Sequence, residues 1–457
     1  MSQRKNVLIL VFDCLRPDHL ASLGYRGTNT PTIDRLAIEG TTFPNAYCQA
    51  PNTWVSHASL FTGCNPYLHG LRTPTRRLSK DLRVMAEVFK EAGYATYGLP
   101  AMSLLSKEAG FTRGFDEYIL DGLRSEPGVL AHRYDRTADE TLARTIDWLR
   151  RVSPPFFGWI HYFGTHKVED HLFDLPEGFR RSYSPYAQYY DGNISFADER
   201  FLSPLVNELS ILDLLDDTIV VLWSDHGEDL HAIEHGRSWG HNWNLTEQVV
   251  RTVLTMRGPG IAREDRREGV ARSIDIFPTL MDLVGLPALP QFEGKSLVQD
   301  SLTHTDVLYM ENLCQGFAAV RRGKYKLVLA EHGAMQEGGW KWKASLVRKT
   351  IGHVMPASMK KLRGRLRRSD ASIWCKTRGE PEEVVQRLIM RGIASLYDLE
   401  VDPDEHRDLA LAQPAVVAEL RQCLAETVER TVPGSQISMS DEDREQLEDR
   451  LRGLGYL

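Results

Sequence analysis

The chain has 457 residues, of which 42% are hydrophobic and 26% are charged, a composition typical of a soluble globular protein. At this length we expect one large core with a smaller second layer attached. A formal net charge of -7 argues against nucleic acid as the main partner, because phosphate binding needs a basic face. The start, MSQRKNVLILVFD, contains neither a signal-peptide pattern nor a run long enough to span a membrane, so we expect a cytoplasmic protein.

Two continuous apolar runs predict buried strands. Asn6 to Phe12 ends abruptly at Asp13, and Thr218 to Trp223 is followed by a serine and then by Asp225 and His226. Short runs of this kind, alternating with helical patterns, are typical of a parallel sheet covered on both faces. The helical patterns between them include Thr32 to Glu39, Leu82 to Ala92 and Ala138 to Leu149. The alternation predicts an α/β layer fold.

The polar residues that follow both runs point to a common site. In open α/β sheets, ligands bind beyond the carboxyl ends of the strands. Asp13 and the Asp225–His226 pair both occupy that place. Taken singly, an Asp-His pair can also be a satisfied polar pair. Two strands that deliver acidic residues to the same edge are more informative than either alone, so we predict a functional site there.

The stretch Ala50 to Gly63, APNTWVSHASLFTG, places a Pro-Asn-Thr turn directly before a helix-like segment. A helix that begins near Ser56 would direct free N–H groups and a partial positive charge at whatever precedes it, which suits an anion. The alternative is that Thr53 or Ser56 only caps this helix, as most Ser and Thr residues at such positions do. Both interpretations stay open on this stretch alone.

Two carboxylates, an imidazole and a hydroxyl at one sheet edge form a reasonable ligand set for one divalent metal ion. The residues are Asp13, Asp225, His226 and Thr53. Oxygen ligands with one nitrogen suit Mn, Mg, Ca or Zn, and the ligand types do not decide among them. Coordination would turn the threonine hydroxyl into a nucleophile, and the helix behind it would receive the negative charge of the incoming group.

The pattern changes from about residue 305, which predicts a division into a catalytic domain over 1–304 and a smaller antiparallel-sheet subdomain over 305–457. Short strand-like runs occupy Val307 to Met310, Phe317 to Val320, Tyr325 to Leu329 and Ser395 to Glu400, with a hairpin turn at 321–324. Helices are predicted over Ala415 to Arg430 and Asp441 to Arg450.

A basic insert over residues 333–369 interrupts this subdomain. Its segment 341–369, KWKASLVRKTIGHVMPASMKKLRGRLRRS, contains no acidic residue and many Lys and Arg, interspersed with apolar side chains. Such a segment could lie on an anionic membrane surface or close over an anionic polymer. A solvated loop is the alternative, and the sequence favours neither.

Seven blocks, in chain order, resemble the sulfatase branch of the alkaline phosphatase superfamily. They are NVLILVFDCLRPDHL, TPTIDRLAIEGTTFPNAY, APNTWVSHASLFTGCNPYLHG, TIVVLWSDHGE, GHNWNLTEQVVRTVLTMRGPGI, SIDIFPTLMDLVGLP and SLYDLEVDPDE. The resemblance implies an α/β/α sandwich with a mostly parallel central sheet, a C-terminal antiparallel-sheet subdomain and a metal-bound nucleophile.

The nucleophile position departs from the sulfatase pattern. Sulfatases resemble one another in a Cys or Ser, followed by x-Pro-x-Arg, that is oxidised to formylglycine. Here the matching positions read Thr53, Trp54, Val55, Ser56 and His57, and threonine cannot become that aldehyde. Thr53 instead resembles the direct threonine nucleophile of the phosphate-ester branches, which favours phosphoryl chemistry over sulfate hydrolysis.

Four further residues are assigned through the resemblance. His166 and His241 match positions that handle the leaving group or the transferred anion, by donating a proton or stabilising negative charge. As lone histidines they would more often be structural. Cys14 stands where many sulfatases carry a second metal-binding Asp, which favours one metal over two, and we expect it to be a small core residue. Arg72 either holds a substrate oxygen or forms a surface ion pair.

The function predicted from these observations is a metal-dependent hydrolase or transferase that acts on phosphate esters through Thr53. The expected partner is an anionic ester substrate, mono- or diester, possibly linked to lipid or glycan. A sulfuric ester hydrolase without formylglycine is one alternative. A catalytically inactive binding scaffold that retains the fold is another.

Overall fold

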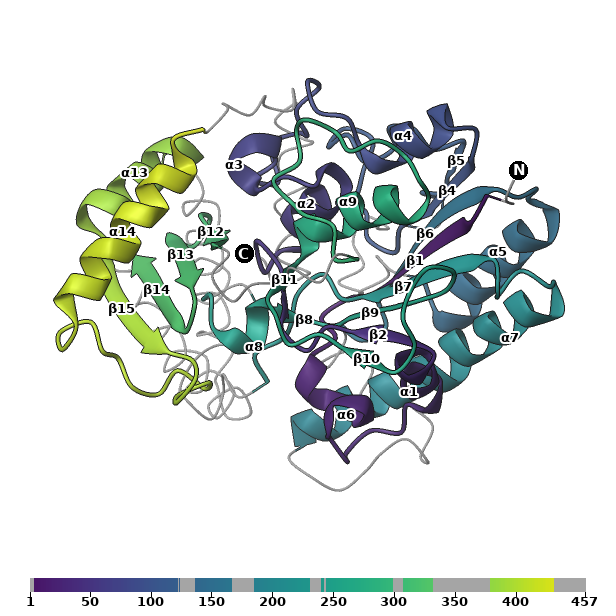
Figure 1. Cartoon of the computed structure of the whole chain (residues 1–457), viewed down its shortest axis with the longest axis horizontal. Coiled ribbons are helices and arrows are strands. Elements are labelled where there is room, and N and C mark those ends of the chain that lie inside the picture. Colours follow the sequence, from purple (N-terminus) through teal and green to yellow (C-terminus); the bar gives the residue numbers. More distant parts are fainter. Residues whose placement is uncertain are drawn as a thin grey trace, which may run out of the picture.

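The computed structural model describes residues 4–121, 123, 136–166, 185–230, 240–241, 244–298, 307–331 and 379–430. These residues form a large, mostly parallel sheet between two layers of helices and a small antiparallel sheet beside it (Figure 1). This is the α/β/α sandwich with a small additional sheet that the sequence predicts. The predicted domain boundary near 304, the basic segment 341–369 within the insert 333–369 and the predicted helix over 441–450 lie outside the described residues.

The large sheet has β1 and β7 at its centre. In spatial order its strands are β10 (Asp265–Arg266), β2 (Gly40–Thr42), β9 (Leu254–Arg257), β7 (Thr218–Trp223), β1 (Asn6–Phe12), β6 (Phe156–Tyr162), β4 (Ala95–Leu99) and β5 (Glu117–Tyr118). β9 runs antiparallel to both of its neighbours, and the other pairs are parallel. β1 and β7 have the predicted bounds because each is an apolar run buried along its whole length.

Helices cover both faces of this sheet, because side chains of successive strand residues point to opposite faces. Val7, Ile9 and Val11 of β1 pack in the core with α2 (Thr53–Thr62), α4 (Met85–Glu91) and α9 (Ser273–Leu283), and the intervening residues of β1 pack in the second core. That second core is formed with α1 (Pro31–Ile38), α5 (Ala138–Arg151), α6 (Pro185–Ala197) and α7 (Ser203–Ile211). The two layers lie above and below the sheet in Figure 1.

Several helices begin where a specific group satisfies their first N–H groups. α1 starts at Pro31, one residue before the predicted start, and the Asp198 carboxylate accepts hydrogen bonds from the N–H groups of Thr32 and Ile33 at 3.0 and 2.8 Å. Asp198 lies in a π-helical segment, Asp198–Leu202, that joins α6 to α7. α5 begins at Ala138, as predicted, behind a capping box formed by Thr137 and Glu140.

The small sheet is antiparallel, in the order β12 (Leu308–Asn312), β13 (Phe317–Arg322), β14 (Tyr325–Ala330) and β15 (Ile393–Asp398). α13 (Pro381–Arg391) and α14 (Pro414–Val428), at the left of Figure 1, cover one face. The other face packs against apolar residues of the larger body. They include Tyr47 of β3 (Ala46–Tyr47), which is the middle strand of a three-stranded sheet with β11 (Ala271–Arg272) and β8 (Arg251–Thr252). They also include Val249 and Val250 of α8 (Glu247–Val250).

Buried ion pairs also join the small sheet to the larger body. Arg72 is 2% exposed, and its Nε donates to Glu311 Oε1 of β12 at 2.9 Å. Lys326 of β14 is likewise buried and lies 2.9 Å from Glu247 and from Glu405. The ion pair of Arg72 is therefore not at the surface, because Glu311 of β12 supplies its partner from within the fold.

None of the described helices is both long enough and apolar enough to cross a lipid bilayer.

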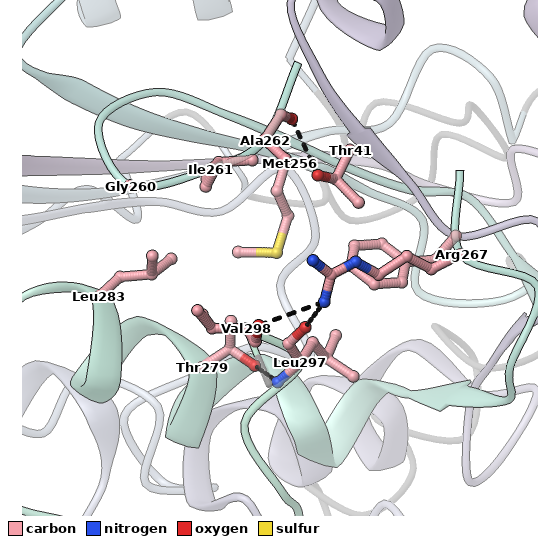
Figure 2. A pocket seen from close by; sticks show the side chains of 11 residues that line it. Thr41, Met256, Gly260, Ile261, Ala262, Arg267, Thr279, Leu283, Leu297 and Val298 are labelled. Atoms are coloured by element: carbon pink, nitrogen blue, oxygen red, sulfur yellow. Dashed lines mark hydrogen bonds between the residues drawn. The ribbon is translucent and has the colours of Figure 1, made fainter. Parts of the chain in front are cut away.

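A small pocket lies between the sheet and α9 (Figure 2). Its lining includes Met256 of β9, Thr279 of α9 and Gly260, and Arg267 donates from Nη1 to the Leu297 carbonyl at 2.6 Å beside it. Gly260 lies next to Lys5, which precedes β1. The pocket is therefore at the amino end of β1, away from the carboxyl edge at which the sequence predicts the functional site.

The buried His69 ties the short helix α3 (Pro66–His69) to α2. The Leu71 N–H donates to His69 Nδ1 at 3.2 Å, so the ring proton is on Nε2, which donates to Ser59 Oγ at 3.2 Å. Burial, and then the neighbouring Arg72 charge, lowers the pKa of His69 to about 3. The imidazole therefore stays neutral in the folded protein at neutral and mildly acidic pH.

We expect acid to destabilise the protein through His69. Below about pH 6.5 the unfolded chain binds a proton at this residue that the folded chain does not bind, so the free energy of unfolding falls as the pH drops toward 3. Between pH 8 and pH 5 the loss from this residue is about 2 kcal/mol. In urea unfolding, the total decrease in the free energy of unfolding from pH 8 to pH 5 should be about 2 kcal/mol smaller in His69→Gln than in the wild type. The control variant His406→Gln, at an exposed site, should show the same pH-dependent decrease as the wild type. A decrease in His69→Gln as large as that of the wild type would contradict the lowered pKa of His69.

Candidate active site

The carboxyl ends of β1 and β7 bring Asp13 and Asp225 together. Val11 of β1 pairs with Trp223 of β7, and both aspartates follow two residues later. The Asp13 N–H donates to the Tyr162 carbonyl at 3.0 Å, and Thr165 Oγ1 donates to the Asp13 carbonyl at 2.5 Å. Both aspartate side chains are fully buried. The predicted edge of the sheet therefore carries two carboxylates held by fixed backbone contacts.

Helix α2 presents Thr53 to these carboxylates. The helix begins at Thr53, after Asn52, rather than near Ser56. Thr53 Oγ1 lies 3.5 Å from Asp13 Oδ2 and 3.3 Å from His226 Nε2, and Ser56 Oγ donates to the Asp225 carbonyl at 2.6 Å. The two hydroxyls thus face the acidic edge, which favours the functional interpretation of this stretch over simple capping. The positive end of the helix dipole points the same way.

The four predicted ligands converge in a geometry that suits a divalent cation. Asp225 Oδ2 lies 3.4 Å from His226 Nε2, and one oxygen or nitrogen from each of Asp13, Asp225 and His226 lies within 4.8 Å of the others. His226 Nδ1 donates to the Gly227 carbonyl at 3.0 Å, which leaves the Nε2 lone pair facing the carboxylates. Asp225 Oδ2 is buried with no hydrogen-bond partner among the described residues. A buried, unpartnered carboxylate oxygen is the kind of donor that a cation satisfies.

The electrostatic field at His226 agrees with this interpretation. Burial alone would lower the pKa of His226, but the carboxylates of Asp225 and Asp13 raise it above its ordinary value. A site that favours a proton at this position also favours another cation, because the same negative charges attract both.

Two histidines behind the ligands hold them in place. Ala101 N–H donates to His161 Nδ1 at 3.3 Å, so Nε2 carries the proton and donates to Asp13 Oδ2 at 3.0 Å. His57 Nδ1 donates to the Thr53 carbonyl at 2.7 Å, and its ring packs edge-on against Trp159 and Trp223. Burial lowers the pKa of His161 to about 4 and of His57 to about 3. Both imidazoles therefore act as neutral supports.

The sequence analysis overlooked His161, although a signal for it was present. It lies in β6 opposite Val11 in the register of the sheet, one residue from the strand end. A polar side chain on an otherwise apolar central strand, near the end that carries the site, could have identified it.

His166 and His241 lie on the outer side of the ligand cluster. The His241 ring centre is 4.1 Å from that of His226 and 5.2 Å from that of His166, which stacks on Phe163. Burial lowers the pKa of His166 to about 4 and moves the pKa of His241 well below its ordinary value. The protonated form considered for these residues is therefore disfavoured, and neutral imidazoles suit proton acceptance at neutral pH. His231 and His235, four positions apart in the sequence, lie outside the described residues.

The thiol of Cys14 lies beside the candidate metal ligands. It is fully buried, but it belongs to none of the apolar clusters. Its Sγ lies 3.1 Å from Asp13 Oδ1, 3.5 Å from His226 Nδ1 and 3.6 Å from His241 Nδ1. Cys14 is therefore buried, as expected of a small core residue, but its thiol projects among the candidate ligands.

Comparisons with known proteins agree with this architecture. The family model Sulfatase matches residues 5–286, which is more than half of the chain. A Sulfatase of Formosa agariphila is 25% identical over 372 residues, covering 65% of this chain and 72% of its own length. Arylsulfatase K of Homo sapiens is 23% identical over 354 residues, with coverages of 64% and 65%. The low-salt glycan biosynthesis sulfotransferase of Haloferax volcanii is 27% identical over 290 residues, with coverages of 62% and 61%.

The chain thus spans less than two thirds of the length of the latter two relatives.

Solved structures share the fold along almost the whole chain. A protein solved with its substrate D-glucosamine-2-N,6-O-disulfate has a TM-score of 0.66 at 17% identity, covering 94% of this chain and 99% of its own. The phosphonate monoester hydrolase of Agrobacterium radiobacter has a TM-score of 0.65 at 16% identity, with coverages of 96% and 99%. The family model, which matches more than half of the chain, shows that this chain belongs to the sulfatase family.

Proposed function

We propose that the protein is a metal-dependent hydrolase or transferase of phosphate esters in which Thr53 is the nucleophile. The observation that carries the proposal is the position of Thr53 Oγ1, at the first residue of α2 and within 3.5 Å of both Asp13 Oδ2 and His226 Nε2. A buried hydroxyl at a positive helix end, beside two carboxylates, is placed to attack an anionic ester.

Threonine restricts how the covalent intermediate is resolved. An ester formed on formylglycine hydrate has a second hydroxyl on the same carbon, which can expel the bound group. An ester on Thr53 has no such hydroxyl, so an outside oxygen nucleophile must attack the central atom and displace Thr53. That nucleophile is water for a hydrolase or an acceptor hydroxyl for a transferase. Phosphorus accepts such attack in both halves of the reaction, which supports phosphate esters as the substrate.

Asp13, Asp225, His226 and Thr53 would hold the metal ion. A bound divalent ion would lower the pKa of the Thr53 hydroxyl and offset the negative charge of the ester. His161 and His57 keep Asp13 and the first turn of α2 in position from behind. The N–H groups at the start of α2 bind the oxygens of the transferred group.

The proton transfers follow from the neutral state of His166. In the first half, Thr53 Oγ1 bonds to phosphorus and gives its proton to a neutral imidazole, and the bond to the leaving oxygen breaks as that oxygen takes up the proton. In the second half, a water or acceptor hydroxyl attacks phosphorus and its proton passes to the neutral imidazole of His166 or His241. The bond from phosphorus to Thr53 Oγ1 then breaks, and this oxygen takes back the proton. Burial lowers the pKa of His166 to about 4, so this imidazole is unprotonated at neutral pH and can accept a proton.

Sulfuryl ester chemistry on the same threonine is the second candidate. It is favoured by the names of the relatives, which include sulfatases and a sulfotransferase that is 27% identical to this chain. The sulfated sugar bound by one structural neighbour is also an anionic ester. Transfer of a sulfuryl group from Thr53 to an acceptor hydroxyl would need the same residues as phosphoryl transfer.

The metal site predicts a change in thermal stability. Metal-stripped protein should unfold at a higher temperature when Mn²⁺, Ca²⁺, Zn²⁺ or Mg²⁺ is added. At a metal concentration 100 times the dissociation constant, the free energy of unfolding should rise by about 2.7 kcal/mol. Asp225→Asn preserves the size of the side chain but removes its charge, so most of this gain should disappear. Asp216→Asn alters a side chain that is 99% exposed and should retain the gain. Equal gains in the two variants would contradict the ligand assignment.

The nucleophile is tested on matched esters with one leaving group: an aryl phosphate monoester, a phosphodiester, a phosphonate monoester and a sulfate ester. We expect turnover of a phosphorus ester that requires metal and falls by about 10³-fold or more in Thr53→Ala. Thr53→Ser retains the hydroxyl and should retain much of the rate. Acid quenching followed by mass spectrometry should detect phosphate on residue 53 of the wild type.

Each other outcome has a defined meaning. Full activity in Thr53→Ala would refute the threonine nucleophile. Turnover of the sulfate ester alone would replace phosphoryl by sulfuryl chemistry. Metal binding without turnover of any ester, with or without added acceptor alcohol, would favour the binding scaffold.

A further inference from the structure

The short helix α8 lies between the small sheet and the large one (Figure 1). On one side, its residues Val249 and Val250 pack in one apolar cluster with side chains of β12, β13 and β14. On the other side, α8 contacts the loop over residues 224–228, the ligand loop, which follows β7 and carries Asp225 and His226. One helix therefore touches both the small sheet and the candidate metal site.

Main-chain contacts fix the ligand loop against α8. The Gly227 N–H donates to the Val249 carbonyl at 2.9 Å. Gly227 also approaches the helix so closely that a β-carbon at this position would lie 2.1 Å from the Gln248 carbonyl oxygen. At the end of the loop, Arg16 donates from Nη1 to the Glu228 carbonyl at 2.8 Å. The position of α8 therefore determines where Gly227 can lie.

The contact with α8 bears directly on the orientation of the His226 ring. His226 Nδ1 donates to the Gly227 carbonyl at 3.0 Å, and this hydrogen bond leaves Nε2 facing the carboxylates. The groups that accept the second ring proton of a metal-binding imidazole determine its orientation and affect the metal affinity. A shift of α8 would move Gly227, and with it the acceptor that orients this imidazole.

Three buried charged groups fix the start of α8 to the small sheet. Lys326 Nζ of β14 lies 2.9 Å from Glu247 Oε1 and 2.9 Å from Glu405 Oε1, and the lysine side chain is fully buried. Glu405 Oε2 accepts a hydrogen bond from the Glu247 N–H, the first of α8, at 2.7 Å. Burial alone would lower the pKa of Lys326, but the charges of Glu247 and Glu405 raise it above its ordinary value. The lysine therefore stays charged and holds both carboxylates.

The backbone of Glu405 is strained. Its φ angle is 58°, in the left-handed region, which is unfavourable for a residue with a β-carbon. Such conformations persist where surrounding contacts determine them. Here the carboxylate contacts Lys326 and the first N–H of α8. The strained residue is thus the one that links the segment after β15 to α8.

We propose that Lys326 and Glu405 are positioning residues for the metal site and act through α8 on the orientation of His226. The inference rests on the function proposed above, because it takes His226 as a metal ligand. The contacts form a continuous series. Lys326 and Glu405 hold Glu247 of α8, α8 holds Gly227, and the Gly227 carbonyl holds the imidazole. The small sheet therefore contributes to metal affinity without supplying a candidate ligand.

A purely electrostatic effect of Lys326 would have the opposite sign. Lys326→Met removes a positive charge, so the electric field alone would raise the affinity for a divalent cation. The same substitution leaves Glu247 and Glu405 buried beside each other without their shared cation. Their repulsion would displace the start of α8, so a positioning role predicts a fall in affinity.

The experiment compares full-length wild type and Lys326→Met in two measurements. Binding of Mn²⁺ is measured from the electron paramagnetic resonance signal of the free ion, and hydrogen exchange of the ligand loop is measured by mass spectrometry on metal-free protein. We expect Lys326→Met to weaken Mn²⁺ binding by about 10-fold and to speed exchange of the loop by about 10-fold. Glu311→Gln is the matched control, because it breaks the buried ion pair of Arg72 with the small sheet. It should be destabilised but should keep the wild-type affinity and loop exchange.

Two substitutions at Glu405 provide a second test if Lys326→Met does not fold. Both Glu405→Gln and Glu405→Ala remove the same charge, but only glutamine retains an oxygen that can accept the Glu247 N–H. We expect the alanine variant to show the weaker Mn²⁺ binding and the faster loop exchange, and equal effects would overturn the proposal.

The remaining outcomes separate this inference from the function on which it rests. Unchanged or higher Mn²⁺ affinity in Lys326→Met, or equal changes in Glu311→Gln, would overturn the positioning role alone. Wild type that binds Mn²⁺ no better than Asp225→Asn would refute the metal site, and the inference with it.

Discussion

The need to neutralise carboxylates buried at the ends of two central strands determines the arrangement of the rest of the site. Asp13 and Asp225 are fully buried because β1 and β7 run through the middle of the sheet and end beneath α2. Neutral groups can satisfy part of this charge. His161 and the N–H groups of Cys14 and His226 donate to these carboxylates, but Asp225 Oδ2 has no donor among the described residues. A cation bound beside that oxygen would satisfy it.

Helix α2 is held firmly against the edge of the sheet that carries the buried carboxylates. Every residue from Thr53 to Thr62 is buried, the Ser56 hydroxyl donates to the Asp225 carbonyl, and α9 packs along the helix. Its C-terminus is fixed as well, because the Gln291 side-chain amide donates to the Thr62 carbonyl at 2.9 Å. The hydroxyl at the first residue of the helix is therefore held in one place relative to the sheet edge.

The parts of this structure that could be predicted from sequence are those set by local patterns. β1 and β7 were predictable because each is a continuous apolar run followed by polar residues: Asp13 directly after β1, and Asp225 and His226 one residue beyond the end of β7. The start of α2 was placed too late, because Ser56 looked like a cap, whereas its hydroxyl donates to a carbonyl 169 residues away. His161, Glu228 and the environment of Cys14 could not be read from local patterns, since their partners come from distant segments: Cys14 contacts residues more than 200 positions later. A small apolar residue next to an aspartate gives no local sign that imidazoles surround it.

The two carboxylate oxygens of Asp13 face different parts of the site. Its Oδ2 atom faces Thr53 and His161, and its Oδ1 atom faces Cys14, so a cation on either side changes the charge available to the other. Asp225 also contacts both, because its Oδ1 atom accepts from the Cys14 N–H at 3.2 Å while its Oδ2 atom lies 3.4 Å from His226 Nε2. The surroundings of the Thr53 hydroxyl and of the Cys14 thiol are therefore electrostatically linked, since the same two carboxylates contact both groups of side chains.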